Sequence, residues 1–173
     1  MLPKDNVNDK SKEFETVFLN SLDGFEFESL CQRIFQKGKF GEVEKIGGVS
    51  DAGRDLIIYT DKNEKIIVEC KHQPRTSIGR PIVQKLHSAI ISENSKKGII
   101  VTTGKFAKTA IDYSNELTDG TNIELMDIMK LTELAQRVGI ELVTEGEDLR
   151  VFMFPINNEE ELKKKFAHIF SKT

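Results

Sequence analysis

Three charged residues in the middle of the chain have the types and spacing of a hydrolytic metal site. Glu69 and Lys71 close an apolar stretch at residues 66–68, and Asp55 opens the preceding apolar stretch at residues 56–58. Both stretches are rich in β-branched side chains and a polar turn separates them, so we expect a β-hairpin. Alternation along a strand sends Glu69 and Lys71 to the same face of that hairpin.

The spacing also places Asp55 on that face. Asp55 precedes Glu69 by an even 14 residues, and a three-residue loop centred on Lys62 would set the two carboxylates opposite each other. Two carboxylates at that distance repel, so one stays protonated unless a cation lies between them. Hard oxygen ligands suit Mg²⁺, for which Mn²⁺ can substitute. Lys71 could then orient or deprotonate a water and offset charge that develops on a phosphate.

Each of these residues also has a purely structural interpretation. Asp55 follows a glycine by two positions and can be a turn residue, and Glu69 with Lys71 can form a salt bridge at a sheet edge. The pattern acid, any residue, lysine is weak in a chain with 31% charged residues, and it recurs at Glu161-Leu162-Lys163. The position of the three residues at one end of two adjacent strands is what favours a site.

The whole chain is typical of one globular domain. Its 173 residues, 38% of them hydrophobic, are enough for one substantial core. No stretch approaches the roughly 18 apolar residues that cross a bilayer, so we expect no membrane partner. Residues 1–12 do not resemble a secretory signal, and Cys31 and Cys70 have neither disulfide-framework nor zinc spacing. We therefore expect a reducing, cytoplasmic location.

The elements around the hairpin predict an α/β fold with a mixed central sheet. A helix is expected from Asp23, where Glu26 completes a capping-box pattern. Hydrophobic periodicity then predicts strands at 43–46, 98–103 and 123–126, and helices at 81–93, 106–117 and 128–138. This order predicts an antiparallel meander that leads into parallel strands, with helices on both faces of the sheet.

We divide the chain into three parts. Residues 1–14 are expected to be a polar tail, and residues 15–140 the α/β domain. Residues 141–173 are expected to form a strand–helix extension, with a strand at 150–154 and a helix from Asn157 or Asn158. The apolar stripe of that helix would pack on the domain or on a second subunit.

These patterns resemble the PD-(D/E)xK nuclease superfamily and, more specifically, the Mrr-like restriction endonuclease catalytic domain. The resemblance covers about residues 22–137 and includes several ordered stretches besides Asp55 and Glu69-x-Lys71. These stretches are residues 24–28, 50–55, 81–86, 97–104 and 123–127, together with Ala107 and Ala110. The resemblance implies a restriction-endonuclease-like fold and a metal-dependent endonuclease that hydrolyses DNA with a metal-activated water.

The resemblance also implies a role for each site residue. Asp55 and Glu69 would hold the metal together with the main-chain carbonyl of Cys70, and Lys71 would act on the water. Glu28 occupies the position of the family's helical acid, which completes the metal site or positions the lysine; the alternative is a solvated helix acid.

Three positions bear further on the resemblance. Gln84 matches a polar position on the crossover helix that often faces the site. Arg54 stands where the superfamily's name places a proline, although Mrr-like members commonly lack it. Many relatives have glutamine where this chain has Glu69, and the extra negative charge predicts tighter metal binding.

Charge is unevenly distributed along the chain. The net charge is −3, yet residues 71–110 hold eight Lys or Arg against one acid, Glu93. Such a block can face a phosphate backbone even in an acidic protein, and the alternative is a solvated helix face. The bases expected to contact DNA are Arg75, Arg80, Lys85, Lys105 and Lys108.

Other functions remain open at the level of sequence. Within the same fold, archaeal Holliday junction resolvases share the helical acid, the aspartate and Glu-x-Lys, so a structure-specific nuclease is the first alternative. From another class, the chain could be a DNA-binding or complex-forming module without turnover on its own, or an interaction protein whose region 141–173 docks a partner. A homodimer would suit a nuclease that cuts both strands, and the sequence does not decide between monomer and dimer.

Overall fold

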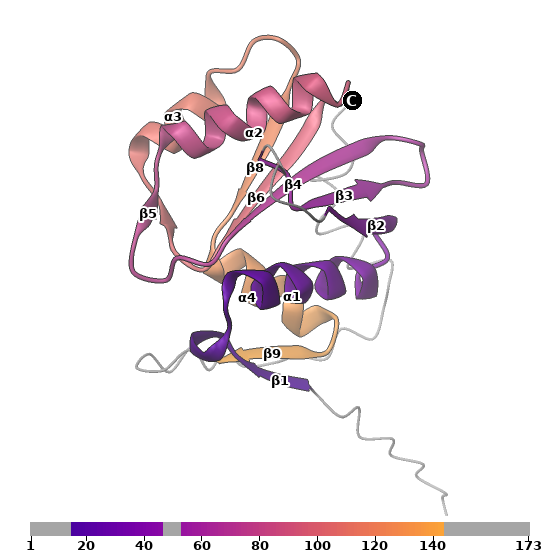
Figure 1. Ribbon diagram of the computed structural model, residues 1–173, viewed down its shortest axis with the longest axis vertical. Coiled ribbons are helices and arrows are strands. Elements are labelled where there is room, and N and C mark those ends of the chain that lie inside the picture. Colours follow the sequence, from indigo (N-terminus) through magenta and orange to yellow (C-terminus); the bar gives the residue numbers. More distant parts are fainter. Residues whose placement is uncertain (1–14, 47–52, 144–173) are drawn as a thin grey trace, which may run out of the picture.

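A five-stranded mixed sheet forms the centre of the computed structural model, which describes residues 15–46 and 53–143 (Figure 1). The strand order is β2-β3-β4-β6-β8; β2, β3 and β4 are antiparallel neighbours, whereas β4, β6 and β8 run parallel. Their bounds are β2 (Glu42–Lys45), β3 (Leu56–Tyr59), β4 (Lys65–Lys71), β6 (Lys97–Thr102) and β8 (Asn122–Met126). The predicted meander leading into parallel strands is confirmed.

Helices cover both faces of the sheet. In Figure 1, α1 (Gly24–Lys37) and α4 (Ile128–Arg137) lie on one face, and α2 (Arg80–Ser92) and α3 (Lys108–Asn115) on the other. Alternation along β4 divides its side chains between two cores: Ile66 and Val68 pack with α1 and α4, while Ile67 packs with α2. Each face of the central sheet is therefore buried, as expected for parallel strands with helical crossovers.

The β3–β4 hairpin has the predicted register. Leu56 pairs with Val68, and the Thr60 N–H donates to the Glu64 carbonyl at 2.9 Å. The three residues between that pair form the loop, and the last of them, Asn63, has a φ of 62°, a left-handed conformation that asparagine tolerates. The regular register ends at Leu56 and Val68, so the predicted hairpin is confirmed as far as that pair. The Asp55 N–H then donates to the Val68 carbonyl at 2.8 Å, which places Asp55 beside the segment of β4 that carries Glu69.

Two small pairings were not predicted. Strand β1 (Glu15–Phe18) lies parallel to β9 (Ile140–Val143), and β5 (Ser77–Ile78) lies parallel to β7 (Lys105–Phe106). The second pair explains why α3 begins at Lys108 and not at the expected residue 106. The expected tail at 1–14, most of the loop 47–54, and the strand and helix expected beyond residue 149 lie outside the described residues.

None of the helices found in residues 15–46 and 53–143 combines the length and apolar character of a membrane span. The two cysteines, Cys31 and Cys70, are buried free thiols. Both belong to the core between the sheet and α1.

The start of α1 generates a prediction about stability. The Asp23 side chain accepts a hydrogen bond from the Glu26 N–H, and the Glu26 carboxylate accepts one from the Asp23 N–H, each at 2.8 Å. Asp23→Ala removes this capping box and should lower the free energy of unfolding by about 1 kcal/mol. Urea denaturation measures the loss, with Asp61→Ala, in the exposed hairpin loop, as the control. Equal stability of the two variants would contradict the prediction.

Candidate active site

Asp55 and Glu69 are the most deeply buried acids among the described residues. Their exposed fractions are 5% and 2%. Asp55 directly precedes β3 and Glu69 lies on β4, both at the end of the hairpin opposite its turn. Asp55 Oδ2 accepts a hydrogen bond from the Cys70 N–H at 2.6 Å. One oxygen of Asp55 is thus held by the main chain of β4, which fixes the orientation of the carboxylate.

Burial raises the pKa of Asp55 from its ordinary value of 3.8 to about 6. The Cys70 N–H lowers it, the charges of Glu69 and Glu28 raise it further, and the Lys71 ammonium lowers it. The effects of desolvation and of the neighbouring acids on the pKa of Asp55 are therefore larger than those of the hydrogen bond and the lysine. Without a cation, the Asp55 carboxyl group therefore resists losing its proton beside these acids.

The Lys71 ammonium lies 2.5 Å from Glu69 Oε1. The contact is an ion pair rather than a well-directed hydrogen bond, and it reaches from a partly exposed lysine, 26% accessible, to an acid that is 2% accessible. A structural salt bridge would show the same contact. The feature that a simple salt bridge does not explain is Asp55, a second buried acid beside the pair.

The main-chain carbonyl of Cys70 is on the same side of β4 as Asp55. In a strand the N–H and C=O of one residue leave on the same side, and the Cys70 N–H is directed at Asp55. The next carbonyl, that of Lys71, faces β6, where the Thr102 hydroxyl donates to it at 2.9 Å. Two carboxylates and one carbonyl are a donor set that fits a hard divalent cation.

Acidic, histidine and cysteine side chains do not gather in threes into a metal-binding cluster anywhere in residues 15–46 and 53–143. Glu28 in particular is engaged elsewhere: its carboxylate lies 3.3 Å from Lys45 Nζ. Glu28 lies on α1, which packs on the face of the sheet opposite to the Glu69 side chain. Its charge is still close enough to raise the pKa of Asp55. The structure thus brings Glu28 near the two acids without placing it among the candidate ligands.

Lys45 is a neighbour of the site that sequence reasoning missed. Its ammonium donates to the Ser29 hydroxyl at 2.8 Å and to the Phe25 carbonyl at 3.0 Å, and it lies 3.3 Å from the centroid of the Phe25 ring. The available signal was alternation: Lys45 shares a strand face with the buried Val43, and a charge at such an inward position needs a partner.

The segment before Asp55 is tied to α2. The Arg54 guanidinium makes a close ion pair with Glu93, and the Lys65 ammonium lies 3.3 Å from the same carboxylate. Gly53 has a φ of 87°, and a Cβ there would come within 2.8 Å of the Lys85 side chain. The stem of Lys85 therefore packs directly on the chain that leads into Asp55.

Gln84 precedes Lys85 on α2 and is exposed. Its carbonyl accepts a hydrogen bond from the Ser88 hydroxyl at 3.1 Å. No hydrogen bond joins its side chain to the buried acids within residues 53–143. The structure places Gln84 on the helix above the site but does not bring it into the carboxylate cluster.

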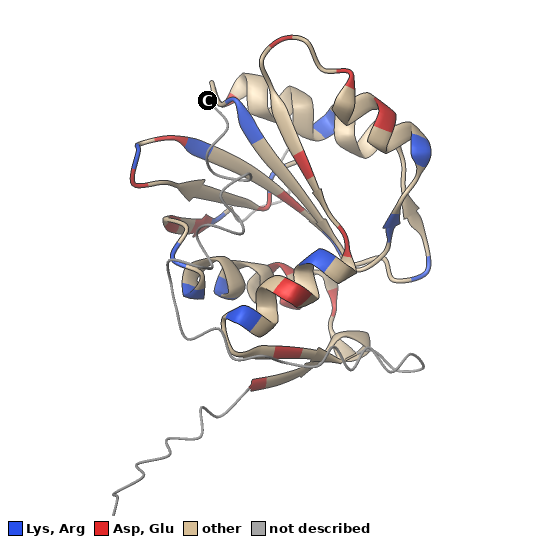
Figure 2. Ribbon diagram, turned by 180° about the vertical axis from the view of Figure 1, so that it is seen from behind, with Lys and Arg blue, Asp and Glu red and all other residues tan. Residues whose placement is uncertain are grey.

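Six of the eight basic residues of the block 71–110 form two groups at different places in the fold (Figure 2). Most of the bases predicted to contact DNA are exposed around β5 and β7, beyond the carboxyl ends of β4 and β6; these are Arg75, Arg80, Lys105 and Lys108. Arg80 lies over the Tyr113 ring, with Cζ 4.8 Å from the centroid, and Lys108 pairs with Asp112 at 2.6 Å.

The second group lies at the amino end of β6. Lys97 is buried and pairs with Glu64 at 2.9 Å, and Lys96 donates to the Asp119 carbonyl at 3.4 Å. These two lysines are at the end of the sheet opposite Lys71 because β4 and β6 are parallel. The block that is continuous in sequence is thus divided in space, and only one part of it lies near the candidate site.

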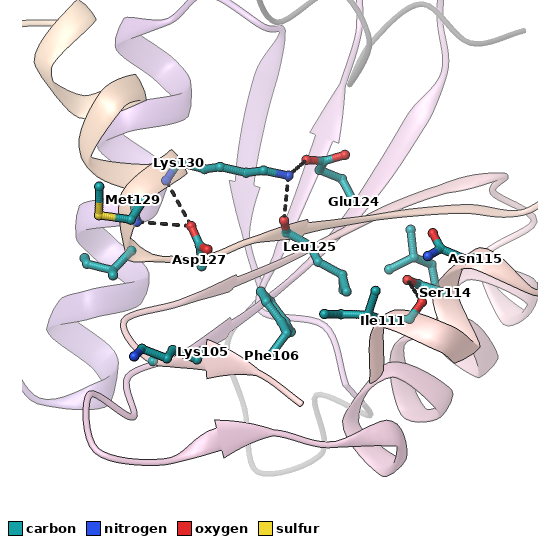
Figure 3. Close-up of a pocket in the computed structure, with 13 residues that line it drawn as sticks. Lys105, Phe106, Ile111, Ser114, Asn115, Glu124, Leu125, Asp127, Met129 and Lys130 are labelled. Atoms are coloured by element: carbon teal, nitrogen blue, oxygen red, sulfur yellow. Dashed lines mark hydrogen bonds and ion pairs between the residues drawn. The ribbon is translucent and has the colours of Figure 1, made fainter. Parts of the chain in front are cut away.

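A groove of about 530 Å³ lies elsewhere, between α3, the edge strand β8 and the start of α4 (Figure 3). Three of its charged side chains, those of Asp127, Lys130 and Glu124, already have structural partners. Asp127 caps α4 by accepting from the Met129 and Lys130 N–H groups, both at 3.1 Å. The Lys130 ammonium donates to Glu124 at 2.6 Å and to the Leu125 carbonyl at 3.0 Å. The groove is therefore a less suitable place for chemistry than the two buried acids.

The raised pKa of Asp55 predicts how stability depends on pH. Between about 3.8 and 6 the folded state binds the Asp55 proton more tightly than the unfolded state, so stability falls as pH rises through this window. Asp55→Asn removes the effect. Relative to wild type, the variant should gain about 2 kcal/mol in stability between pH 4 and pH 7.5 in EDTA.

Denaturation with urea at the two pH values measures this difference. The exposed variant Asp61→Asn serves as the control, and its difference from wild type should stay constant with pH. A constant difference for Asp55→Asn as well would show that Asp55 titrates normally.

Two known proteins are similar to this chain. Over 106 residues, the chain is 31% identical to the type IV methyl-directed restriction enzyme EcoKMrr of Escherichia coli strain K12, covering 60% of this chain and 32% of that enzyme. The chain thus spans about a third of the length of this relative. The fold is similar to that of the DNA modification-dependent restriction endonuclease AspBHI, with a TM-score of 0.52, 17% identity, and coverage of 84% of this chain and 35% of that one.

A family model for restriction endonucleases, that of the Mrr catalytic domain, matches residues 19–135. The matched region is more than half of the chain and contains the whole central sheet, both buried acids and Lys71. The resemblance identified from the sequence motifs is thereby confirmed, and the chain belongs to the Mrr family of restriction endonucleases.

Proposed function

We propose that this chain is a metal-dependent DNA endonuclease with Asp55, Glu69 and Lys71 at its catalytic site. The observation that carries the proposal is the burial of two acids on adjacent strands, with the pKa of Asp55 raised to about 6. Burying such a pair is unfavourable unless a cation compensates for it. Membership of a restriction endonuclease family supplies the class of reaction that such a cation would serve.

The ligands of the cation would be Asp55, Glu69 and the carbonyl of Cys70. Asp55 Oδ2 is held by the Cys70 N–H, which leaves Oδ1 for the metal. A bound Mg²⁺ or Mn²⁺ would lower the pKa of a coordinated water and offset negative charge on the phosphate. The protein's part is to keep these oxygens fixed and largely shielded from solvent, so that they are ready to bind before the substrate arrives.

Lys71 would orient the attacking water and contact a phosphate oxygen. Its side chain is partly exposed while its ammonium touches Glu69, so it borders both the buried acids and the solvent from which DNA approaches. Glu28, held by Lys45, would add negative charge to the surroundings of Asp55 without binding the metal. In this assignment Lys71 contacts the water and the phosphate, and Glu28 acts only through its charge.

The exposed bases around β5 and β7 would bind the DNA backbone. They follow the carboxyl end of β4, the end that carries Lys71, and phosphate contacts of this kind position a duplex without reading its sequence. The names of the two relatives refer to methylated or modified DNA. The chain spans only about a third of each relative, so what we propose for it is the cleavage of DNA.

A plasmid assay tests the proposed activity. With Mg²⁺ or Mn²⁺ the wild type should convert supercoiled plasmid to open-circle or linear product, and Lys71→Ala should lower the rate at least about a hundredfold, as expected for a group acting in proton transfer. Lys62→Ala, in the exposed hairpin loop, is the matched control and should cut normally. A wild type that cuts nothing with either ion, or a fully active Lys71→Ala, would refute the proposal.

The same preparation can be offered a four-way junction beside a linear duplex of equal length. Preference for the junction would favour the structure-specific alternative within the same fold. Cleavage of both at similar rates would favour a general endonuclease.

Metal affinity tests the role of Glu69. Glu69→Gln keeps the shape of the side chain and removes one negative charge, so it should weaken Mg²⁺ binding by about tenfold or more in calorimetric titration. Glu42→Gln, an exposed acid on β2, should bind Mg²⁺ like the wild type. Equal affinity of Glu69→Gln and wild type would remove Glu69 from the set of ligands.

A further inference from the structure

We propose that Thr102 and Thr103, at the carboxyl end of β6, are positioning residues that hold the Lys71 ammonium beside Glu69. They would act through the main chain that follows Glu69 and would touch neither metal nor DNA. The inference rests on the proposed function of Lys71, and it assigns a role to the hydroxyl groups of two buried threonines.

The end of β4 depends on β6 for its support. Regular pairing with β3 reaches only as far as Val68, opposite Leu56, whereas pairing with β6 continues to Lys71, opposite Thr102. Beyond Val68, β6 is therefore the regular strand neighbour of β4 within the described residues. Any group on β6 that holds the main chain at Lys71 also restricts where its side chain can reach.

Thr102 makes such a contact. It is fully buried, and its hydroxyl donates to the Lys71 carbonyl at 2.9 Å while accepting from the Gly104 N–H at 3.0 Å. The Thr103 N–H donates to the same Lys71 carbonyl at 3.3 Å. Two donors at the carboxyl end of β6 thus hold the carbonyl of Lys71. The Thr102 hydroxyl, which is one of them, is itself held by the Gly104 N–H in the turn after β6.

Thr103 holds the next two residues of the chain. It is 6% exposed, and its hydroxyl oxygen accepts from the Gln73 N–H at 2.9 Å and lies 3.2 Å from His72 Nδ1. The His72 ring also interacts with the main chain of Leu22, two residues before the start of α1. The contacts of Thr103 and His72 therefore join the end of β4 to the start of α1, the helix that carries Glu28.

Close packing leaves this segment little freedom. A Cβ at Gly104 would lie 2.4 Å from the carbonyl oxygens of Gln73 and Thr76, so the turn after β6 contacts the backbone of the loop after β4 directly. The His72 ring packs against Phe27, with the ring centroids 5.3 Å apart. The hydroxyl groups of Thr102 and Thr103 therefore act on a segment that is already confined, and their loss should displace Lys71 without unfolding the domain.

The test uses the nearly isosteric variants Thr102→Val and Thr103→Val, with Thr102→Ser and Thr103→Ser as rescue variants that restore the hydroxyl. Thr121→Val is the matched control, because Thr121 is also buried, at 8% exposed, and lies at the opposite end of the parallel strands. Thermal unfolding checks that each variant is folded. If one valine variant does not fold, the other decides the outcome.

Two measurements do not require activity. Amide hydrogen exchange at Gly104 should be about tenfold faster or more in Thr102→Val, and that at Gln73 in Thr103→Val, with no change in Thr121→Val. The side-chain NMR signal of Lys71, assigned by its absence in Lys71→Ala, should shift in the valine variants and return in the serine variants. Unchanged exchange and an unchanged Lys71 signal would overturn the inference.

Cleavage kinetics supply the third measurement. Each valine variant should lower kcat about tenfold with KM for DNA within about twofold, and Thr102→Val should have no further effect in a Lys71→Ala background. The same loss in both backgrounds would show that the threonine does not act through Lys71. If the wild type cuts no DNA, the proposed function fails, and hydrogen exchange with the Lys71 signal still decides whether the threonines hold the lysine.

Discussion

The burial of Asp55 and Glu69 on neighbouring strands is the constraint on which the rest of the structure depends. A slip of one residue in the β3–β4 register would move Asp55 to the other face of the sheet, and the pair would be lost. The register is set at the far end of the hairpin, where a three-residue loop ends in the left-handed Asn63. A turn distant from the acids therefore controls whether they meet.

Local patterns were sufficient to predict the hairpin, its register and the order of the parallel strands, because each is encoded in alternation or helical periodicity over a few residues. The β1–β9 pair could not be found in this way. It joins strands of four residues that lie some 125 positions apart, and the alternation in so short a strand does not show which other strand is its partner. The same reason applies to Glu28: a helix pattern identified the acid, and only the packing of α1 against β2 showed that Lys45 is its partner.

Charge illustrates a different limit of sequence reasoning. Eight bases between residues 71 and 110 form one block along the chain, yet a βαβ crossover carries the chain from one end of the sheet to the other and back. Lys97 consequently lies in a buried ion pair with Glu64, while Arg75 and Lys105 are exposed near the candidate site. A count of charges per segment could predict that a basic surface exists, but its position depended on strand direction. For Gln84, the helix that carries it was predicted from the sequence, but its exposed side chain was not.

The parallel pairing of β1 with β9 has a mechanical consequence. Glu15 lies beside Ile140 and Phe18 beside Val143, so chain segments attached before residue 15 and after residue 143 leave this small sheet at opposite ends. Tension between them would load all four residue pairs together in shear, a direction in which the hydrogen bonds must break together and not one after another. In Figure 1 the two strands lie beyond α1 and α4, away from the central sheet. Force from flanking segments would thus be resisted there before it reached the strands that carry Asp55 and Glu69.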